Sequence, residues 1–263
     1  MKKPTKKEVY ARFGIDFDGT YIMTPYGPAR PLLKNGNTKL GPLVYAFSLL
    51  AGTGLYKAVI NGVEYDVLGT CCCDCTGCYA KVGRYRQKNV IASLALNTLL
   101  ARFYPDFLRR AIQAQIAADD IRIIRIHAAG DFFSAVYIDV WKSTALMYAD
   151  VNMWTYTKYG PAEHAFDDIK NFNVVSSIIA GKGVNYGHID YVLAMYEYLQ
   201  QAGVPVHICR CGIDKNQHCQ NCRGCTLYKF VLFIEHSTDY DAKSDPLYPV
   251  IVAVINAQKD VNF

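Results

Sequence analysis

The sequence predicts an α/β fold built on a parallel sheet, either a (βα)6-like barrel or a partial barrel. From about residue 88 onward, short β-branched runs alternate with longer segments of helical apolar spacing, and turn residues separate them. Such alternation is typical of right-handed βαβ units and a parallel sheet. The 263 residues, 51% of them hydrophobic, suit one domain of this kind. Functional residues are then expected at the carboxyl ends of the strands.

Each element follows from a local pattern. The run 121–126 is β-branched and ends at a Gly-Asp pair, Pro105 separates two helical segments, Ser134 is a candidate helix cap and Gly203 a helix stop. The expected strands are 121–126, 151–156, 173–178, 204–208 and 230–234, and the expected helices are 89–101, 107–118, 134–149, 162–170, 188–201 and 248–258.

Three regions are expected along the chain. Residues 1–40 are rich in Pro, Gly, Asn and Thr and predict an irregular N-terminal segment. Residues 41–208 form the barrel body with its cysteine loop. Residues 209–263 combine a Cys-rich metal knuckle with a last strand and helix.

Composition narrows the class of protein. The longest apolar stretch, 43–55, is too short and too interrupted to span a bilayer, and the Lys-rich N-terminus lacks the apolar core of a secretory signal. We therefore expect a cytoplasmic protein without a membrane partner. The net charge of +5 is mild, and its basic group at residues 81–88 is either a solvated face or a phosphate-contacting patch. Nothing in the sequence predicts the oligomeric state.

The first cysteine cluster carries the main functional hypothesis. Cys71, Cys75 and Cys78 have the spacing C-x3-C-x2-C, which resembles the radical S-adenosylmethionine superfamily. That resemblance implies a [4Fe-4S] cluster held by three thiolates, with S-adenosylmethionine bound at the iron that lacks a protein ligand. The family usually has an aromatic residue before the last Cys, whereas this chain has Gly77 there and Tyr79 after it.

The first cysteine cluster has two further interpretations, a zinc site and a disulfide. Cys72 and Cys73 also lie in the loop, and Cys72-x2-Cys75-x2-Cys78 is itself a zinc or cluster spacing. A disulfide is less favoured because it requires an oxidising compartment.

Polar residues at the expected strand ends supply candidate contacts. The radical S-adenosylmethionine resemblance places Gly130 and Asp131 where the superfamily binds the amino group of the cofactor, with Asp in place of the usual Glu. His127 is a candidate ligand, base or substrate contact, with a hydrogen-bonded structural histidine as its alternative. The catalytic candidates are His127, Asp131 and Lys158, and the cofactor-binding candidates are Gly130, Asp131, Thr157, Ser176 and Tyr79.

The second cysteine cluster predicts another metal site. Two C-x2-C steps share one cysteine, and a fourth ligand completes a tetrahedron. The candidate ligands are Cys211, Cys219, Cys222, Cys225 and His236, with Cys209 as a further choice. Structural zinc is the leading interpretation and a second iron-sulfur cluster the next.

Read together, several segments resemble the phage and mobile-element family named gene product 88. They are 36–41, 47–52, 78–80, 125–132, 156–158 and the second cysteine cluster with His236. The resemblance implies no established reaction. A phage setting suits modification of a nucleotide or nucleic acid.

Three other functions compete with this hypothesis. The run Asp16-Phe17-Asp18-Gly19-Thr20 matches the D-x-D-G-T motif of haloacid-dehalogenase-like phosphatases, with Asp167 and Asp168 as a magnesium pair; its alternative is an ordinary Asp-Gly turn. A zinc-containing base-exchange enzyme similar to tRNA-guanine transglycosylases would use Asp131 as acid, base or nucleophile. A non-enzymatic, zinc-stapled nucleic-acid-binding protein would use the basic groups and the tyrosines. The preferred prediction is a radical S-adenosylmethionine-like iron-sulfur enzyme acting on a nucleotide or nucleic acid.

Overall fold

The computed structural model describes residues 3–35, 40–72, 78–176, 186–187, 189–209, 224–228, 230–234 and 242–258. At its centre lies a four-stranded parallel sheet in the order β3-β6-β7-β8. Its strands are β3 (Val44–Phe47), β6 (Ile123–Ile126), β7 (Asn152–Thr157) and β8 (Phe172–Ser176). The register pairs Phe47 with Ile126, Ile126 with Thr155, and Thr157 with Ser176, so the carboxyl ends of all four strands meet at one edge.

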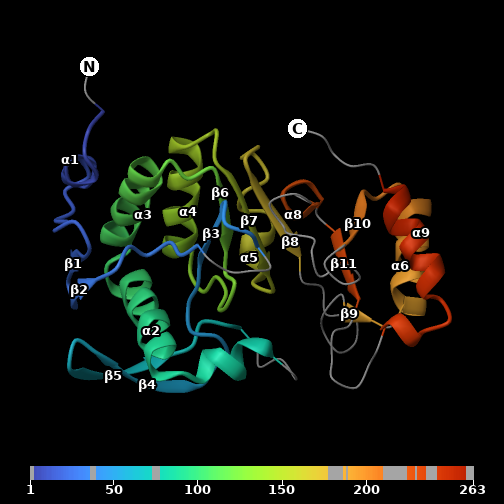
Figure 1. The fold of residues 1–263 in the computed structure, drawn as a ribbon, viewed down its shortest axis with the longest axis horizontal. Helices are drawn as coiled ribbons and strands as arrows, with labels where there is room; N and C mark the ends of the chain where they lie inside the picture. The colour runs from blue at the N-terminus through green and yellow to red at the C-terminus, as the bar shows by residue number, and fades with distance from the viewer. Residues whose placement is uncertain are drawn as a thin grey trace.

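Three helices form the layer on one face of this sheet (Figure 1). They are α2 (Lys88–Phe103), α3 (Pro105–Asp119) and α4 (Ala135–Met147). Because side chains alternate along a strand, Ile124 and Ile126 join the large core beneath the helices, whereas Ile123 faces the other side with Val44 and Trp154. The predicted helices 89–101 and 107–118 are confirmed, as is the Ser134 cap, whose Oγ accepts the Tyr137 N–H at 3.2 Å.

The second face of the sheet looks toward the C-terminal part of the chain (Figure 1). A three-stranded parallel sheet in the order β10-β11-β9 lies there, with its own apolar core beneath two helices. These elements are β9 (Tyr186–Gly187), α6 (Ile189–Gln201), β10 (Val206–Ile208), α8 (Gly224–Leu227), β11 (Phe230–Ile234) and α9 (Tyr248–Ala257). Val175 of β8 packs with Val231 of β11, which joins the two sheets.

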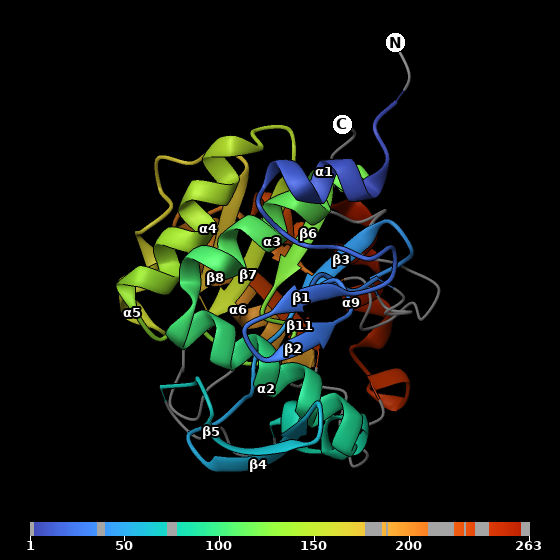
Figure 2. The same ribbon diagram turned by 90° about the vertical axis from the view of Figure 1, so that its left-hand side faces the viewer.

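The N-terminal segment is more regular than its composition predicts. Thr5 and Glu8 form a capping box that starts α1 (Lys6–Arg12), and β1 (Ile22–Thr24) and β2 (Gly27–Ala29) form a hairpin. Figure 2 shows both at the same end of the molecule as α3. The expectation of an irregular segment over 1–40 is therefore wrong for its described residues, because turn-forming residues also build hairpins.

A second hairpin was not foreseen at all. Strands β4 (Leu55–Ile60) and β5 (Val63–Leu68) pair antiparallel around the turn at Asn61 and Gly62 and lead directly into the cysteine loop. The remaining short helical segments are η1 (Tyr79–Lys81), η2 (Gly83–Arg86), α5 (Gly160–Glu163) and η4 (Ala242–Ser244).

The parallel α/β class is confirmed, but the described residues show two separate parallel sheets, besides the two hairpins, and no closed barrel. In the three-stranded sheet β11 lies between β9 and β10, so the strands do not follow chain order as they do around a (βα) barrel. Among the described residues, no helix has the length and apolar character needed to cross a bilayer.

Candidate functional site at the carboxyl ends of the strands

The loop that leaves β6 is held very close to neighbouring backbone. Gly130 has φ +79°, and a Cβ there would lie 2.7 Å from Leu49 Cβ and 2.8 Å from Thr70 Oγ1. Leu49 N–H also donates to the Ala129 carbonyl at 2.9 Å. Only glycine meets both the backbone conformation and the space, so Gly130 fixes the path of this loop.

Asp131 follows as a buried carboxylate with several donors. Its Oδ1 accepts the Thr157 hydroxyl at 2.6 Å and the Phe132 N–H at 2.7 Å, and its Oδ2 accepts the Lys158 N–H at 2.8 Å. Burial raises the pKa of Asp131 to about 6, although these hydrogen bonds and the Lys158 charge act in the opposite direction. The side chain thus ties the end of β6 to the end of β7.

Thr70 is a site residue that sequence reasoning missed. It is 3% exposed, its hydroxyl donates to the Leu50 carbonyl at 2.9 Å, and its Oγ1 accepts the Asp131 N–H at 3.1 Å. The residue immediately precedes the cysteine loop, and a small polar residue at that place is the one signal the sequence offers. Thr70 links the start of the cysteine loop to the loop after β6.

The two ends of the cysteine loop lie on the same small cluster. Cys71 and Cys78 both pack against Ala51, Ala80 and Ala129. The Gly52 N–H donates to Cys71 Sγ at 3.1 Å, an interaction that favours sulfur carrying negative charge. The loop therefore begins and ends beside Ala129, one residue before Gly130.

Cys72 contacts the next strand end. Its exposed thiol donates to the Lys158 carbonyl at 3.5 Å. The structure thereby brings together Cys71, Cys72 and Cys78 with the Gly130-Asp131 loop and Lys158. Cys75 lies outside the described residues.

His127 points away from this group into the core. It is 3% exposed, its Nε2 lies 2.9 Å from the Tyr137 hydroxyl, and its Nδ1 lies 3.2 Å from Thr155 Oγ1. Burial lowers its pKa to about 3, so the ring stays neutral. This geometry favours the structural alternative over a catalytic role, because both ring nitrogens are engaged inside the helix-covered core.

The other candidates lie along the same edge. Thr157 is buried and committed to Asp131, and Ser176 pairs with Thr157 in the neighbouring strand. Tyr79 starts η1 directly after Cys78. For Ser176 and Tyr79 the structure places the backbone only.

On the opposite face of the sheet, Cys225 of α8 contacts Tyr156 of β7. The Tyr156 hydroxyl lies 2.6 Å from Cys225 Sγ, and the Arg125 guanidinium lies 5.2 Å from the centre of the Tyr156 ring. Burial, followed by the Cys225 thiol, raises the Tyr156 pKa well above its usual value. Cys209 belongs to the same buried cluster. Two candidate ligands of the second metal site, Cys209 and Cys225, therefore lie in one cluster.

The remaining predicted ligands of the second metal site fall outside the described residues. These are Cys211, Cys219, Cys222 and His236. Within the part of the chain that is described, no three His, Cys, Asp or Glu side chains gather closely enough to hold a metal ion. Both metal sites thus stay predictions.

The D-x-D-G-T run forms an exposed turn. Asp18 Oδ1 accepts the N–H groups of Thr20 and Tyr21 at 2.7 Å each, and Phe17 pairs with Ile22 across the turn. A phosphatase nucleophile is expected at the carboxyl end of a parallel strand, whereas this turn precedes β1 of an antiparallel hairpin. The geometry supports the ordinary Asp-Gly turn.

Together these features define an α/β protein with a cysteine-bordered polar site at the carboxyl edge of a parallel sheet. The family model described as Gene product 88 matches residues 31–183, more than half of the chain. The chain belongs to the gene product 88 family.

A relative supports this assignment. The Gene 88 protein of Mycobacterium phage D29 is 28% identical over 110 residues, and the match covers 37% of this chain and 44% of that protein. The matched part is thus less than half the length of this curated relative. No solved structure matches the chain significantly.

Proposed function

We propose that this protein is a radical S-adenosylmethionine-like iron-sulfur enzyme that modifies a nucleotide or nucleic acid, with the cysteine loop as its metal site. The observation that carries the proposal is the convergence of Cys71 and Cys78 on one alanine cluster at the carboxyl edge of the sheet. Carboxyl edges of parallel sheets are where α/β proteins bind ligands.

The donor set fits such a centre. Cys71, Cys75 and Cys78 would hold the cluster, and the Gly52 N–H aimed at Cys71 Sγ is the kind of hydrogen bond that tunes cluster thiolates. When bound, the cluster would supply an electron for reductive cleavage of S-adenosylmethionine and so begin radical chemistry.

The protein groups around the loop have separable tasks. Gly130 admits close backbone approach, and Thr70 and Asp131 hold the loop after β6 against the cysteine loop and the end of β7. Because Asp131 already accepts three protein donors, we assign it positioning of these loops. Lys158 is half-buried beside Asp131, and its positive charge is suited to contact an anionic substrate group.

The decisive experiment is anaerobic reconstitution of the full chain, followed by iron, sulfide and zinc analysis. We expect about four irons and four sulfides per cluster site, with broad absorbance at about 400 nm. Cys71→Ala, Cys75→Ala and Cys78→Ala should each lose this absorbance. Cys72→Ala is the matched control, because the exposed Cys72 thiol contacts the Lys158 carbonyl and should leave the cluster intact.

A second candidate is a zinc-stapled protein without radical chemistry, either a base-exchange enzyme or a nucleic-acid-binding protein. Cys209 is buried in an apolar cluster and the half-buried Cys225 packs against it, which favours this candidate, since a structural metal suits such a place. Zinc at both cysteine clusters with no sulfide would replace the iron-sulfur proposal by this one. If Cys72→Ala rather than Cys71→Ala abolished metal binding, the register of the site would be wrong.

A further inference from the structure

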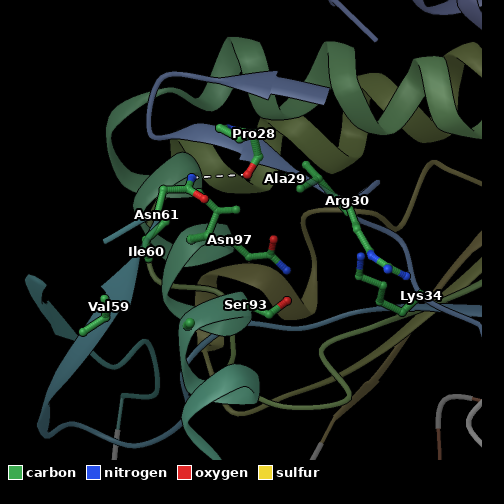
Figure 3. Close-up of a pocket in the computed structure, with 12 residues that line it drawn as sticks. Pro28, Ala29, Arg30, Lys34, Val59, Ile60, Asn61, Ser93 and Asn97 are labelled. Carbon is green, nitrogen blue, oxygen red and sulfur yellow. Dashed lines mark hydrogen bonds between the residues drawn. The ribbon is translucent and has the colours of Figure 1, made fainter. Parts of the chain in front are cut away.

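A separate pocket lies at the N-terminal side of the molecule. Its volume is about 340 Å³, and it is bounded by the end of β2, the end of β4 and the first half of α2 (Figure 3). None of the cysteines, Gly130 or Asp131 lines it. The lining residues that matter here are Arg30, Lys34, Leu32, Ile60, Ser93 and Leu96.

Two cations gather at one side of this pocket. Arg30 and Lys34 lie next to each other there (Figure 3), and the pocket lining contains no acidic residue. Arg30 has no acidic partner among the described residues, and Lys34 Nζ donates only to the Pro31 carbonyl there. Burial, followed by the Arg30 charge, lowers the Lys34 pKa to about 8. Two adjacent cations without an acidic partner repel one another and favour an anion bound between them.

The rest of the pocket is suited to the body of a ligand. The Ser93 hydroxyl points inward (Figure 3) and makes no hydrogen bond to any described residue. Leu32, Ile60 and Leu96 supply an apolar floor. The Asn61 amide is already used, because it donates to the Tyr26 and Pro28 carbonyls at 2.7 and 3.2 Å and so closes the rim. Small-molecule sites combine an apolar lining with a few convergent polar groups in this way.

We propose that this pocket binds a phosphomonoester with a ring-bearing body, of the nucleoside monophosphate class. Two cations match a dianion better than a single carboxylate, and a phosphomonoester carries nearly two negative charges at neutral pH. The Ser93 hydroxyl would donate to a phosphate oxygen, and the apolar floor would contact the ring. The volume lies at the small end of ligand pockets, which suits one mononucleotide. This inference does not depend on the metal site.

Isothermal titration calorimetry on the full chain tests the proposal, with adenosine 5′-monophosphate, inorganic phosphate and adenosine as separate probes. We expect the monophosphate to bind more tightly than phosphate, and phosphate more tightly than adenosine. Arg30→Gln and Lys34→Gln should each weaken monophosphate binding at least about tenfold, since each removes one charge-assisted contact. Arg30→Lys should retain part of the affinity.

Lys170→Gln is the matched control, because Lys170 is an exposed cation that does not line the pocket. It should leave the affinity unchanged within about twofold at fixed salt. An unchanged melting temperature of each variant shows that the fold is retained. Equal affinities of wild type and Arg30→Gln, equal binding of adenosine and its monophosphate, or no binding of any probe at millimolar concentration would each overturn the proposal.

Discussion

At the scale of single residues, Asp131 shows how burial and hydrogen bonding oppose each other. Three donors stabilise the carboxylate, yet its 5% exposure leaves the pKa raised to about 6 against an ordinary 3.8. The charged form is therefore costly at neutral pH, and it is kept because it joins two strand ends. Such a group is typical of functional sites.

The raised pKa of Asp131 predicts that the free energy of unfolding depends on pH. With a folded-state pKa above the unfolded value, the folded protein binds more protons between about pH 4 and pH 6, so the contribution of Asp131 to stability falls as pH rises through that window. The fall amounts to about 3 kcal/mol at most. Asp131→Asn should remove this component, as urea unfolding of both proteins at pH 4.5 and pH 7 will show. The exposed Asp139→Asn should preserve the wild-type profile; a profile of Asp131→Asn that parallels wild type would refute the raised pKa.

Gly130 gives a second prediction at this scale. Gly130→Ala adds a Cβ within 3 Å of Leu49 and Thr70, whereas Gly62→Ala has a similar positive φ and nothing within 4 Å. Both variants share the backbone strain, and only Gly130→Ala adds crowding. We expect Gly130→Ala to lose about 1–3 kcal/mol more of unfolding free energy, measured by chemical denaturation. Equal losses would mean that the loop after β6 is loosely packed.

At the scale of elements, helix α2 organises both sides of the molecule. Thr98 Oγ1 accepts the Leu50 N–H at 3.0 Å, and Asn97 Nδ2 donates to the Ser48 carbonyl at 3.0 Å, which fixes the segment after β3 beside the cysteine loop. Ser93 and Asn97 of the same helix line the N-terminal pocket. One helix thus holds the backbone near the candidate metal site and forms a wall of the candidate phosphate pocket.

The exit of the β4–β5 hairpin depends on one close backbone approach. A Cβ at Gly69 would lie 2.2 Å from the Gly52 carbonyl oxygen, whereas one at Gly54, whose carbonyl accepts the Gly69 N–H, would meet nothing within 4 Å. Arg102 adds to this exit by donating to the Gly69 carbonyl at 3.0 Å. The hairpin therefore delivers Thr70 and Cys71 to the site only while residue 69 has no side chain.

We accordingly expect Gly69→Ala to disturb the cysteine loop and Gly54→Ala to leave it in place. The loss of unfolding free energy for Gly69→Ala should be about 1–3 kcal/mol larger. The alkylation rate of Cys71, followed by peptide mass spectrometry in the metal-free protein, should rise for Gly69→Ala alone. Similar alkylation rates in both variants would show that Gly69 does not position this cysteine.

At the scale of the whole molecule, the two candidate sites draw on segments that are distant in the chain. The pocket joins residues from β2, β4 and α2 with Lys34, whose backbone pairs with Ala46 of β3. In the described structure, Arg30 is the charged group that lies beside Lys34 at one side of the pocket. Folding of the entire N-terminal half is thus needed to form the phosphate pocket.

This arrangement predicts how monophosphate affinity varies with pH. Lys34 is protonated below its pKa of about 8 and neutral above it, while a phosphomonoester is nearly dianionic above about pH 7. Affinity should therefore be highest between about pH 7 and pH 8 and fall by pH 9.5 as one cation is lost. Calorimetry across this range checks the expectation. Lys34→Gln should abolish the decline, and a decline that persists in this variant would assign it to another group.

Much of the fold could be predicted because local patterns specify helices and strands directly. The observed bounds of β11 match the predicted 230–234, and α2, α3, α4 and α6 fall within a few residues of their predicted ranges. The hairpins could not be predicted, and the reason is local. Exposed residues alternate in β4 and β5 without strong apolar contrast, so the pattern there is weak.

The sequence by itself determined the parallel α/β class, the place of the cysteine loop and the membership in the gene product 88 family, because apolar periodicity and motif spacing are local properties. Only the tertiary structure decided that His127 turns into the core, that Asp131 joins two strand ends and that Arg30 and Lys34 lie side by side at a pocket. Those outcomes depend on burial and on contacts between distant segments, which pack only when the whole sheet and its helices assemble.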